Sequence, residues 1–273
     1  MANWDKIQSQ GDVEDRRGSS AAVGVASIGT IAIIGALMFA GGASGTEIQN
    51  FVFDQLGNRI TMDNQTTSQG KFVDTKNYLG FTQKIIGSNN DLWRADFASN
   101  NKKYVEPKLV LFRNQTESGC GGADSRTGPH YCPTDQTIYL DETFFEELKT
   151  KFGAKGGEVA EAYVMSHEVG HHIQKIKGTF AKIDTSINSN SVKVELQADC
   201  YAGVWLGSVT QAGVVTEAEI DQALDAASSV GDDRIQKSQG GRVNPETWTH
   251  GSSEARKKAF MQGFTGKDSS KCE

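Results

Sequence analysis

The sequence of 273 residues predicts an α+β fold, in which a mostly helical domain with a small sheet follows one transmembrane helix. Three observations predict this class. Residues 21–41 are uncharged and mostly apolar, two short β-rich runs lie between residues 107 and 141, and several later segments repeat apolar residues at helical spacing. About 200 residues follow the apolar segment and a polar linker, which is enough for one domain with its own core.

The apolar segment 21–41 is long enough to cross a bilayer as a helix. Lys6, Arg16 and Arg17 precede it, whereas no basic residue follows until Arg59. This charge bias predicts a single-pass protein of the cell membrane, with the N-terminus cytoplasmic and the main domain extracytoplasmic. A cleaved signal peptide is the alternative, but the acidic N-terminal tail is unlike a compact basic signal segment. The predicted organisation is a tail at 1–20, an anchor at 21–41, a linker at 42–74 and a domain at 75–273.

Periodicity places the remaining elements along the chain. Helices are expected where apolar residues recur every three or four positions, and strands where β-branched and aromatic residues lie between turn residues. A short helix is expected to carry Phe144 and Phe152. The other predicted helices are 75–97, 156–177, 190–208, 216–230 and 252–264, and the predicted strands are 107–112 and 136–141.

The segment AYVMSHEVGHHIQ, residues 162–174, has two histidines four residues apart. On a helix, His167 and His171 lie on one face about one turn apart, so their ring nitrogens can hold one metal ion. Glu168 is rotated about a third of a turn and can reach a water on the open side of the metal. This H-E-x-x-H arrangement predicts a catalytic Zn²⁺ site. His172 is rotated about 100° from His171 and is not expected to be a ligand.

A third ligand is expected, because catalytic zinc usually has three protein ligands and one position for water. The segment 191–207 predicts a core-facing helix with Glu195 and Asp199 four residues apart at its margin. Two carboxylates there cost desolvation energy unless a positive charge compensates them. Glu195 is predicted as the third zinc ligand, and Asp199 as the acceptor for the free N–H of a ligating histidine. A solvated acidic edge is the alternative for this pair.

The motif H-E-x-x-H followed by E-x-x-x-D resembles the gluzincin class of zinc peptidases. More closely, the chain resembles the neutral zinc metallopeptidase family of bacterial membrane-anchored proteins. The resemblance rests on seven segments, VEDRRGSS, LVLF, SGCGGADSRTGPHYCPTDQTIYLD, SHEVGHHIQ, ELQADCYAGVW, GDDRIQ and THGSSEARKKAF. It covers nearly all of residues 107–264 and implies a zincin-like metallopeptidase domain that acts on a peptide or protein substrate.

Two other zinc architectures can be tested against the same residues. The metzincin motif needs glycine and histidine where the chain has Gln174 and Lys177, which excludes that class. A peptide deformylase uses a cysteine ligand upstream of its H-E-x-x-H, and Cys120 or Cys132 lies at a conceivable distance. The glycine-rich motifs expected around that cysteine are absent, and a membrane-anchored chain is the wrong setting for this enzyme.

The four cysteines all follow the apolar segment, where an exported domain would form disulfides. Three pairings are possible. The preferred pairs are Cys120–Cys132, which would close a glycine-rich loop, and Cys200–Cys272, which would tie the C-terminus to the helix of Glu195. Four free thiols are the alternative, and no C-x-x-C pair indicates a second zinc site.

The predicted chemistry follows from these assignments. Zn²⁺ held by His167, His171 and Glu195 would lower the pKa of a water in its fourth position. Glu168 would take a proton from this water and deliver it to the departing amine.

The oxyanion needs a further donor, for which His250 is the first candidate, with Tyr131 and His130 behind it. In zincins the strand beside the metal helix often binds substrate as an added strand, and residues 136–141 are the candidate for that edge.

The predicted function is therefore a zinc-dependent peptidase that hydrolyses peptide bonds outside the cytoplasm. The alternative is a membrane-anchored, zinc-stabilised binding or assembly module without turnover. Glu168 favours the peptidase, because a purely structural site would not need a carboxylate at that position. A net charge of −6 without a basic cluster argues against nucleic acid as a partner.

Overall fold

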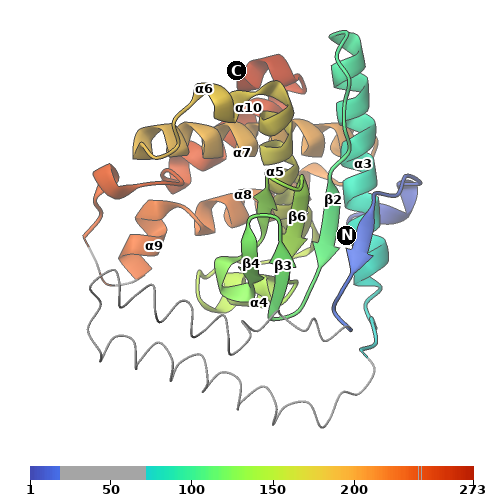
Figure 1. Ribbon diagram of the computed structural model, residues 1–273, viewed down its shortest axis with the longest axis horizontal. Coiled ribbons are helices and arrows are strands. Elements are labelled where there is room, and N and C mark those ends of the chain that lie inside the picture. Colours follow the sequence, from blue (N-terminus) through green and yellow to red (C-terminus); the bar gives the residue numbers. More distant parts are fainter. Residues whose placement is uncertain (19–71, 239, 241) are drawn as a thin grey trace, which may run out of the picture. The chain divides into compact units, whose positions relative to one another are not determined.

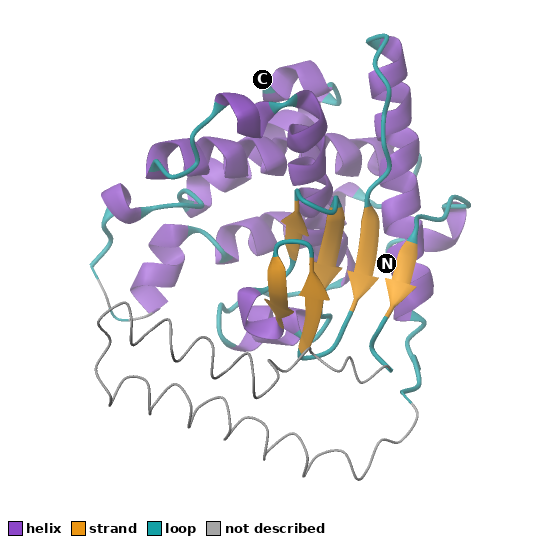
Figure 2. Ribbon diagram, in the orientation of Figure 1, coloured by secondary structure: helices purple, strands orange, loops and turns teal. Residues whose placement is uncertain are grey.

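The computed structural model describes residues 1–18, 72–238, 240 and 242–273 (Figure 1). One compact unit consists of Met1–Arg17 and Asp74–Glu273. Within it, helices predominate and pack around a small sheet (Figure 2). The predicted mostly helical α+β class is confirmed.

The helices agree with the predicted segments within a few residues. Two short helices, α6 and α9, and five 3-10 turns are additional. The helices are α3 (Tyr78–Ser99), α4 (Phe144–Thr150), α5 (Glu158–Lys177), α6 (Thr179–Lys182), α7 (Asn188–Gln211), α8 (Ile220–Ser229), α9 (Asp232–Ser238) and α10 (Ser253–Gly266). The 3-10 turns are η1 (Trp4–Lys6), η2 (Ser125–Thr127), η3 (Glu217–Glu219), η4 (Pro245–Thr247) and η5 (Ser269–Cys272).

A four-stranded sheet has the order β1-β2-β6-β5. The strands β1 (Val13–Asp15), β2 (Lys108–Leu111) and β6 (Thr137–Leu140) are parallel, and β5 (His130–Cys132) runs antiparallel to β6. Two further strands, β3 (Gln115–Ser118) and β4 (Gly121–Asp124), form a separate hairpin.

The prediction that residues 136–141 form a sheet edge is wrong. Strand β6 is paired on both sides, and all four of its residues are buried. Its sequence is therefore apolar because it is an interior strand, not because it receives substrate. Of the described strands, β5 is the one at this edge of the sheet.

Helices α5, α7 and α10 pack closely because glycines lie where their backbones approach. A Cβ atom at Gly170 of α5 would lie 2.9 Å from the Cα atom of Ala198 in α7. A Cβ atom at Gly263 of α10 would lie 1.9 Å from the carbonyl oxygen of Cys200, also in α7. A side chain at either glycine would push the helices apart. The close approach brings polar side chains of all three helices within hydrogen-bonding distance of one another.

The N-terminal segment belongs to this same unit. Strand β1 pairs with β2, with Val13 opposite Leu109. Trp4 is buried, and its indole N–H donates to the Glu158 carboxylate at the start of α5 (2.9 Å). A single membrane crossing between residues 21 and 41 would place the tail and the domain on opposite sides of the bilayer. Their direct packing contradicts the predicted localisation, with a cytoplasmic tail and an extracytoplasmic domain.

The expected transmembrane helix is also without support. No helix in the part of the chain that the structure describes is both long enough and apolar enough to cross a membrane. The segment 21–41 itself lies outside the described residues. The assignment as a single-pass membrane protein, with the membrane as a partner of its N-terminal helix, is therefore corrected.

Both preferred disulfides are present. Cys120 pairs with Cys132, and Cys200 of α7 pairs with Cys272 of η5. The pairing prediction is confirmed and the alternative of four free thiols is wrong. Because Cys120 and Cys132 are bonded to each other, neither is available as the metal-ligating cysteine of a deformylase-like site.

Arg17 fastens the N-terminal segment to the domain. Its side chain is 1% exposed and forms ion pairs with Asp15 (2.7 Å), Asp74 (2.9 Å) and Glu142 (2.9 Å). Arg17 is one of the three basic residues whose position before the apolar segment predicted a cytoplasmic N-terminus. In the structure its charge is neutralised by carboxylates from three segments of the chain.

We expect Arg17→Met to lower the free energy of unfolding by about 3 kcal/mol or more, because it removes one partner of a buried ionic cluster. The matched control is Arg16→Met. The Arg16 side chain is 28% exposed and forms an ion pair with the nearby Glu14. It also donates to Thr116 and Glu117 of β3, but because it is partly solvated we expect its loss to cost less than that of Arg17, about 1 kcal/mol. Urea unfolding of both variants gives the comparison. Equal losses would mean that the Arg17 cluster does not hold the segment in place.

Candidate metal centre

Helix α5 presents His167 and His171 to the same side, as their spacing predicts. The ring centroids are 4.8 Å apart, and the rings are nearly perpendicular. The Glu195 carboxylate of α7 faces both rings. Its Oε2 lies 3.1 Å from Nε2 of His167, and its Oε1 lies 3.4 Å from Nε2 of His171. Two ring nitrogens and one carboxylate therefore converge on a common point.

The other nitrogen of each ring faces away from this point and has an acceptor. Nδ1 of His167 lies 2.8 Å from the Asp199 carboxylate. Nδ1 of His171 lies 2.9 Å from Oε1 of Gln174. A proton on each Nδ1 satisfies these acceptors and leaves Nε2 as the nitrogen that faces Glu195 in both rings. Both histidines thus present Nε2 to the position that a metal would take.

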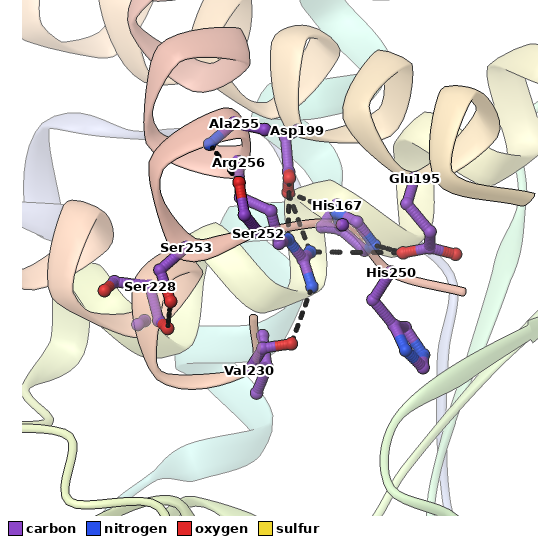
Figure 3. Close-up of polar contacts among 12 residues, drawn as sticks. His167, Glu195, Asp199, Ser228, Val230, His250, Ser252, Ser253, Ala255 and Arg256 are labelled. Atoms are coloured by element: carbon purple, nitrogen blue, oxygen red, sulfur yellow. Dashed lines mark hydrogen bonds and ion pairs between the residues drawn. The ribbon is translucent and has the colours of Figure 1, made fainter. Parts of the chain in front are cut away.

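Asp199 faces Nδ1 of His167, at the position that the sequence predicts, but its main partner was not predicted. The Arg256 guanidinium of α10 donates to both Asp199 oxygens, at 2.8 and 2.9 Å. The Tyr163 hydroxyl of α5 donates to the same carboxylate. Figure 3 shows the guanidinium lying beside Asp199 and reaching toward Glu195, from which it is 4.0 Å away. Asp199 and Arg256 are both buried, and the pair neutralises charge that burial would otherwise make costly.

In the absence of metal, the carboxylates of the site favour a protonated histidine. Burial alone lowers the pKa of His167, but Asp199 and then Glu195 outweigh it and raise that pKa to about 10. Burial raises the pKa of Glu195, but His171 and His167 outweigh it and hold the pKa well below its ordinary value. The carboxylates are therefore ionised and the facing imidazole takes up a proton. A divalent cation bound to the same atoms would displace that proton.

Glu168 differs from its neighbours in having no hydrogen-bond partner. Its side chain is buried, with 6% exposed, and it makes no hydrogen bond or ion pair with any other described residue. A carboxylate oxygen of Glu168 and one ring nitrogen each of His167 and His171 all lie within 4.8 Å of one another. Burial raises the pKa of Glu168, against a smaller lowering by the two histidines.

A cavity of about 870 Å³ opens at these residues. His167, Glu168, His171 and Glu195 line it, and its remaining lining is largely apolar. The apolar part comes mainly from α4, α5, α8 and α9, with Phe144, Leu148, Phe152, Val164, Ala226, Val230 and Ile235. The donor atoms are thus accessible to a substrate with bulky apolar groups.

His250 also lines this cavity, in the loop before α10. Asp232 holds the loop, because its Oδ2 accepts the backbone N–H groups of Thr249, His250 and Gly251 at 2.9, 2.7 and 2.8 Å. Its Oδ1 lies 3.3 Å from Nδ1 of His250. The sequence identified His250 but not Asp232, although GDDRIQ was among the segments noted. The His250 side chain remains 50% exposed.

The other aromatic candidates are engaged elsewhere. The Tyr131 hydroxyl lies 3.0 Å from Nδ1 of His172, whose Nε2 lies 2.6 Å from the carbonyl of Val105. Both nitrogens of His172 are therefore occupied, which agrees with its exclusion as a ligand. His130 stacks on Tyr139 with ring centroids 5.5 Å apart. Tyr131 and His130 line the cavity, but these contacts make neither a clear oxyanion donor.

Comparison with known proteins places the chain in a family. Residues 2–273 match the family described as putative neutral zinc metallopeptidase. The chain belongs to this family. It is 36% identical to the uncharacterised protein YpfJ of Escherichia coli (strain K12), over 98% of this chain and 97% of that protein. It is 45% identical to the uncharacterised protein Rv2575 of Mycobacterium tuberculosis (strain H37Rv), over 62% of each. No solved structure matches the chain.

The donor set suits the metal in the family's description. Two imidazole nitrogens and one carboxylate are a common set at catalytic zinc, and each histidine has the outward acceptor that such sites have. Mg²⁺ and Ca²⁺ would favour a site made of oxygen atoms. His167, His171 and Glu195 therefore remain the predicted zinc ligands in this family member.

The two acidic residues of α7 should differ in their effect on zinc affinity. Glu195→Ala removes a predicted bond to the metal, so we expect a severe loss. Asp199→Asn keeps the shape of the side chain but weakens the acceptor for His167, so we expect a loss of about 10–100-fold. Competition with a chromophoric chelator measures both, and circular dichroism confirms that each variant is folded. The reverse order of severity would assign Asp199 and not Glu195 to the metal.

Zinc binding should release protons at about pH 8, because the raised pKa of His167 keeps its ring protonated in the metal-free protein and a ligand must be neutral. Calorimetric titration in two buffers of different ionisation enthalpy counts the released protons. A count of zero would show that His167 is already neutral.

The stability of the metal-free protein should also depend on pH. A raised pKa of His167 stabilises the folded state fully below the unfolded pKa of 6.5, and this contribution is lost as the pH rises toward 10. Between these two pH values the melting temperature of the metal-free protein should therefore fall more than that of the zinc-loaded protein.

Proposed function

We propose that this protein is a zinc-dependent peptidase whose metal is held by His167, His171 and Glu195. The observation that carries the proposal is the carboxylate of Glu168, which lines the cavity beside the three donors and makes no hydrogen bond with another described residue. A metal site that served only stability would not need a free carboxylate in this position. A general base would need it.

Zn²⁺ in this position supplies a Lewis acid that polarises a substrate carbonyl and lowers the pKa of water. Glu168 then takes the proton from the attacking water and delivers it to the departing amine. Burial suits Glu168 to this role, because it raises the pKa of the carboxyl toward the range in which the group both accepts and donates a proton near neutral pH. The partners of His167 and His171 keep both rings in place through this exchange.

The substrate is a peptide or protein that lies along β5. This strand lines the cavity with His130 and Tyr131 and is paired with β6 on one side only among the described strands. An extended peptide can add to such an edge through its backbone, as substrates do in zincin-like peptidases. The cavity's apolar wall would receive a side chain next to the scissile bond.

His250 is the donor to the oxyanion in this proposal. Asp232 fixes the loop by accepting from three backbone N–H groups. The Thr249 hydroxyl lies 3.0 Å from Nδ1 of His250 and can donate to it, which places the ring proton on Nε2 for the substrate. The ring is half exposed, which allows it to approach a bound substrate.

Glu168→Gln should retain zinc and lose peptide hydrolysis, because the residue moves a proton and is not a predicted ligand. The matched control is Glu161→Gln, which removes another partly buried carboxylate of α5 and should leave hydrolysis unchanged. Digestion of a peptide library by both variants and by the wild type, each with its zinc content measured, gives the comparison. Activity of Glu168→Gln equal to wild type would remove the proposed base. Zinc binding by a wild type that digests no peptide would favour a binding module.

A further inference from the structure

A line of hydrogen bonds joins His171 to the last turn of the chain. Nδ1 of His171 lies 2.9 Å from Oε1 of Gln174. Nε2 of Gln174 donates to Oε1 of Gln197 (3.1 Å), and Nε2 of Gln197 donates to the carbonyl of Cys272 (3.0 Å). We call the side chains of Gln174 and Gln197 the glutamine relay. It connects α5, α7 and η5.

Two backbone carbonyls set the direction of the relay, that of Cys272 at its far end and that of Val194 beside Gln174. A backbone carbonyl can only accept, so Gln197 must turn its NH₂ group toward Cys272 and its oxygen toward Gln174. Gln174 then turns its NH₂ group toward Gln197 and its oxygen toward His171. A second carbonyl, that of Val194, accepts from the same NH₂ group at 2.6 Å. With its oxygen so placed, Gln174 requires the proton of His171 on Nδ1 and leaves Nε2 for a metal.

The carbonyl of Cys272 lies in η5, which the disulfide to Cys200 joins covalently to α7. Polar contacts also hold this turn. They include the ion pair of Lys177 with Glu273 (3.0 Å), the hydrogen bond from Ser269 to Asp96 (2.7 Å), and the hydrogen bond from Gln262 to the carbonyl of Lys271.

We infer that the Cys200–Cys272 disulfide and the glutamine relay position His171 for metal binding, and that losing either one weakens zinc affinity. The inference rests on the proposed zinc site. Gln174 and Gln197 are positioning residues, because they act through His171 and do not touch the metal. The relay gives His171 the acceptor that Asp199 gives to His167.

Zinc affinity of the full chain, measured with a competing chelator, tests this inference. Gln197→Met keeps the approximate length of the side chain and removes both relay bonds, and we expect zinc to bind on the order of tenfold more weakly. The paired substitution Cys200→Ser with Cys272→Ser should act in the same direction. Its control is Cys120→Ser with Cys132→Ser, which removes the other disulfide and should leave zinc affinity unchanged. Wild-type affinity in the first two proteins would overturn the inference.

A background variant separates positioning from general stability. Gln174→Met removes the acceptor of His171 together with the bonds to Gln197 and Val194. In this background Gln197 has no connection to His171, so adding Gln197→Met should cost little further zinc affinity. An undiminished loss in the double variant would show that Gln197 acts through stability and not through His171.

A measurement on the metal-free protein tests the positioning of His171 independently of the proposed function. If the wild type binds no zinc, the proposed function fails, but the relay still predicts a slowly exchanging Nδ1 proton on His171 in the nuclear magnetic resonance spectrum of the metal-free protein. That proton should exchange faster in Gln197→Met. An equal exchange rate in both proteins would overturn the positioning role whether or not zinc binds.

Discussion

The buried carboxylate of Asp199 is the interaction on which both the helix packing and the site depend. It accepts from Tyr163 and His167 of α5 and from the guanidinium of Arg256 in α10, while its own backbone lies in α7. One charge thus joins three helices. Arg256 pairs with Asp199 and also lies 4.0 Å from Glu195, so one guanidinium faces two carboxylates and one negative charge is left over. The site must then take up a proton or a cation, because an unbalanced buried carboxylate is costly.

This arrangement is possible only because the three helices approach closely. A carboxyl group reaches little more than one side chain's length from its backbone, so His167 and Arg256 must both come near α7. Gly170 and Gly263 provide the space, since neither position admits a Cβ atom. Gly170 is also the second unspecified residue of the H-E-x-x-H motif. Helix packing constrains this position, although Gly170 is not a predicted metal ligand.

Local spacing predicted the part of the site that lies on single helices. His167, Glu168 and His171 share one turn, and Glu195 and Asp199 share another, so the 3.6-residue period was sufficient. Arg256 joins the site through tertiary packing, and nothing in the spacing around it indicates a buried partner. The same holds for β1, a three-residue charged strand whose pairing with β2 spans about a hundred residues and leaves no alternating pattern. The predicted localisation was wrong because it used the basic residues before the apolar segment to orient the chain in a membrane, whereas Arg16 and Arg17 pair with carboxylates of the folded unit.

Hydrogen bonds also distinguish the predicted metal ligands, which are held in place, from Glu168, whose protonation state can change. Both histidines have an acceptor at Nδ1, and Glu195 is held between their rings. When a group with satisfied hydrogen bonds moves or changes its protonation state, the broken hydrogen bonds cost free energy. Glu168 has no such partner among the described residues, so protonating it breaks no hydrogen bond. The residue of the site that makes no hydrogen bond with another described residue is therefore the one best able to exchange a proton, and the hydrogen bonds of its neighbours keep the donor atoms in place while it does so.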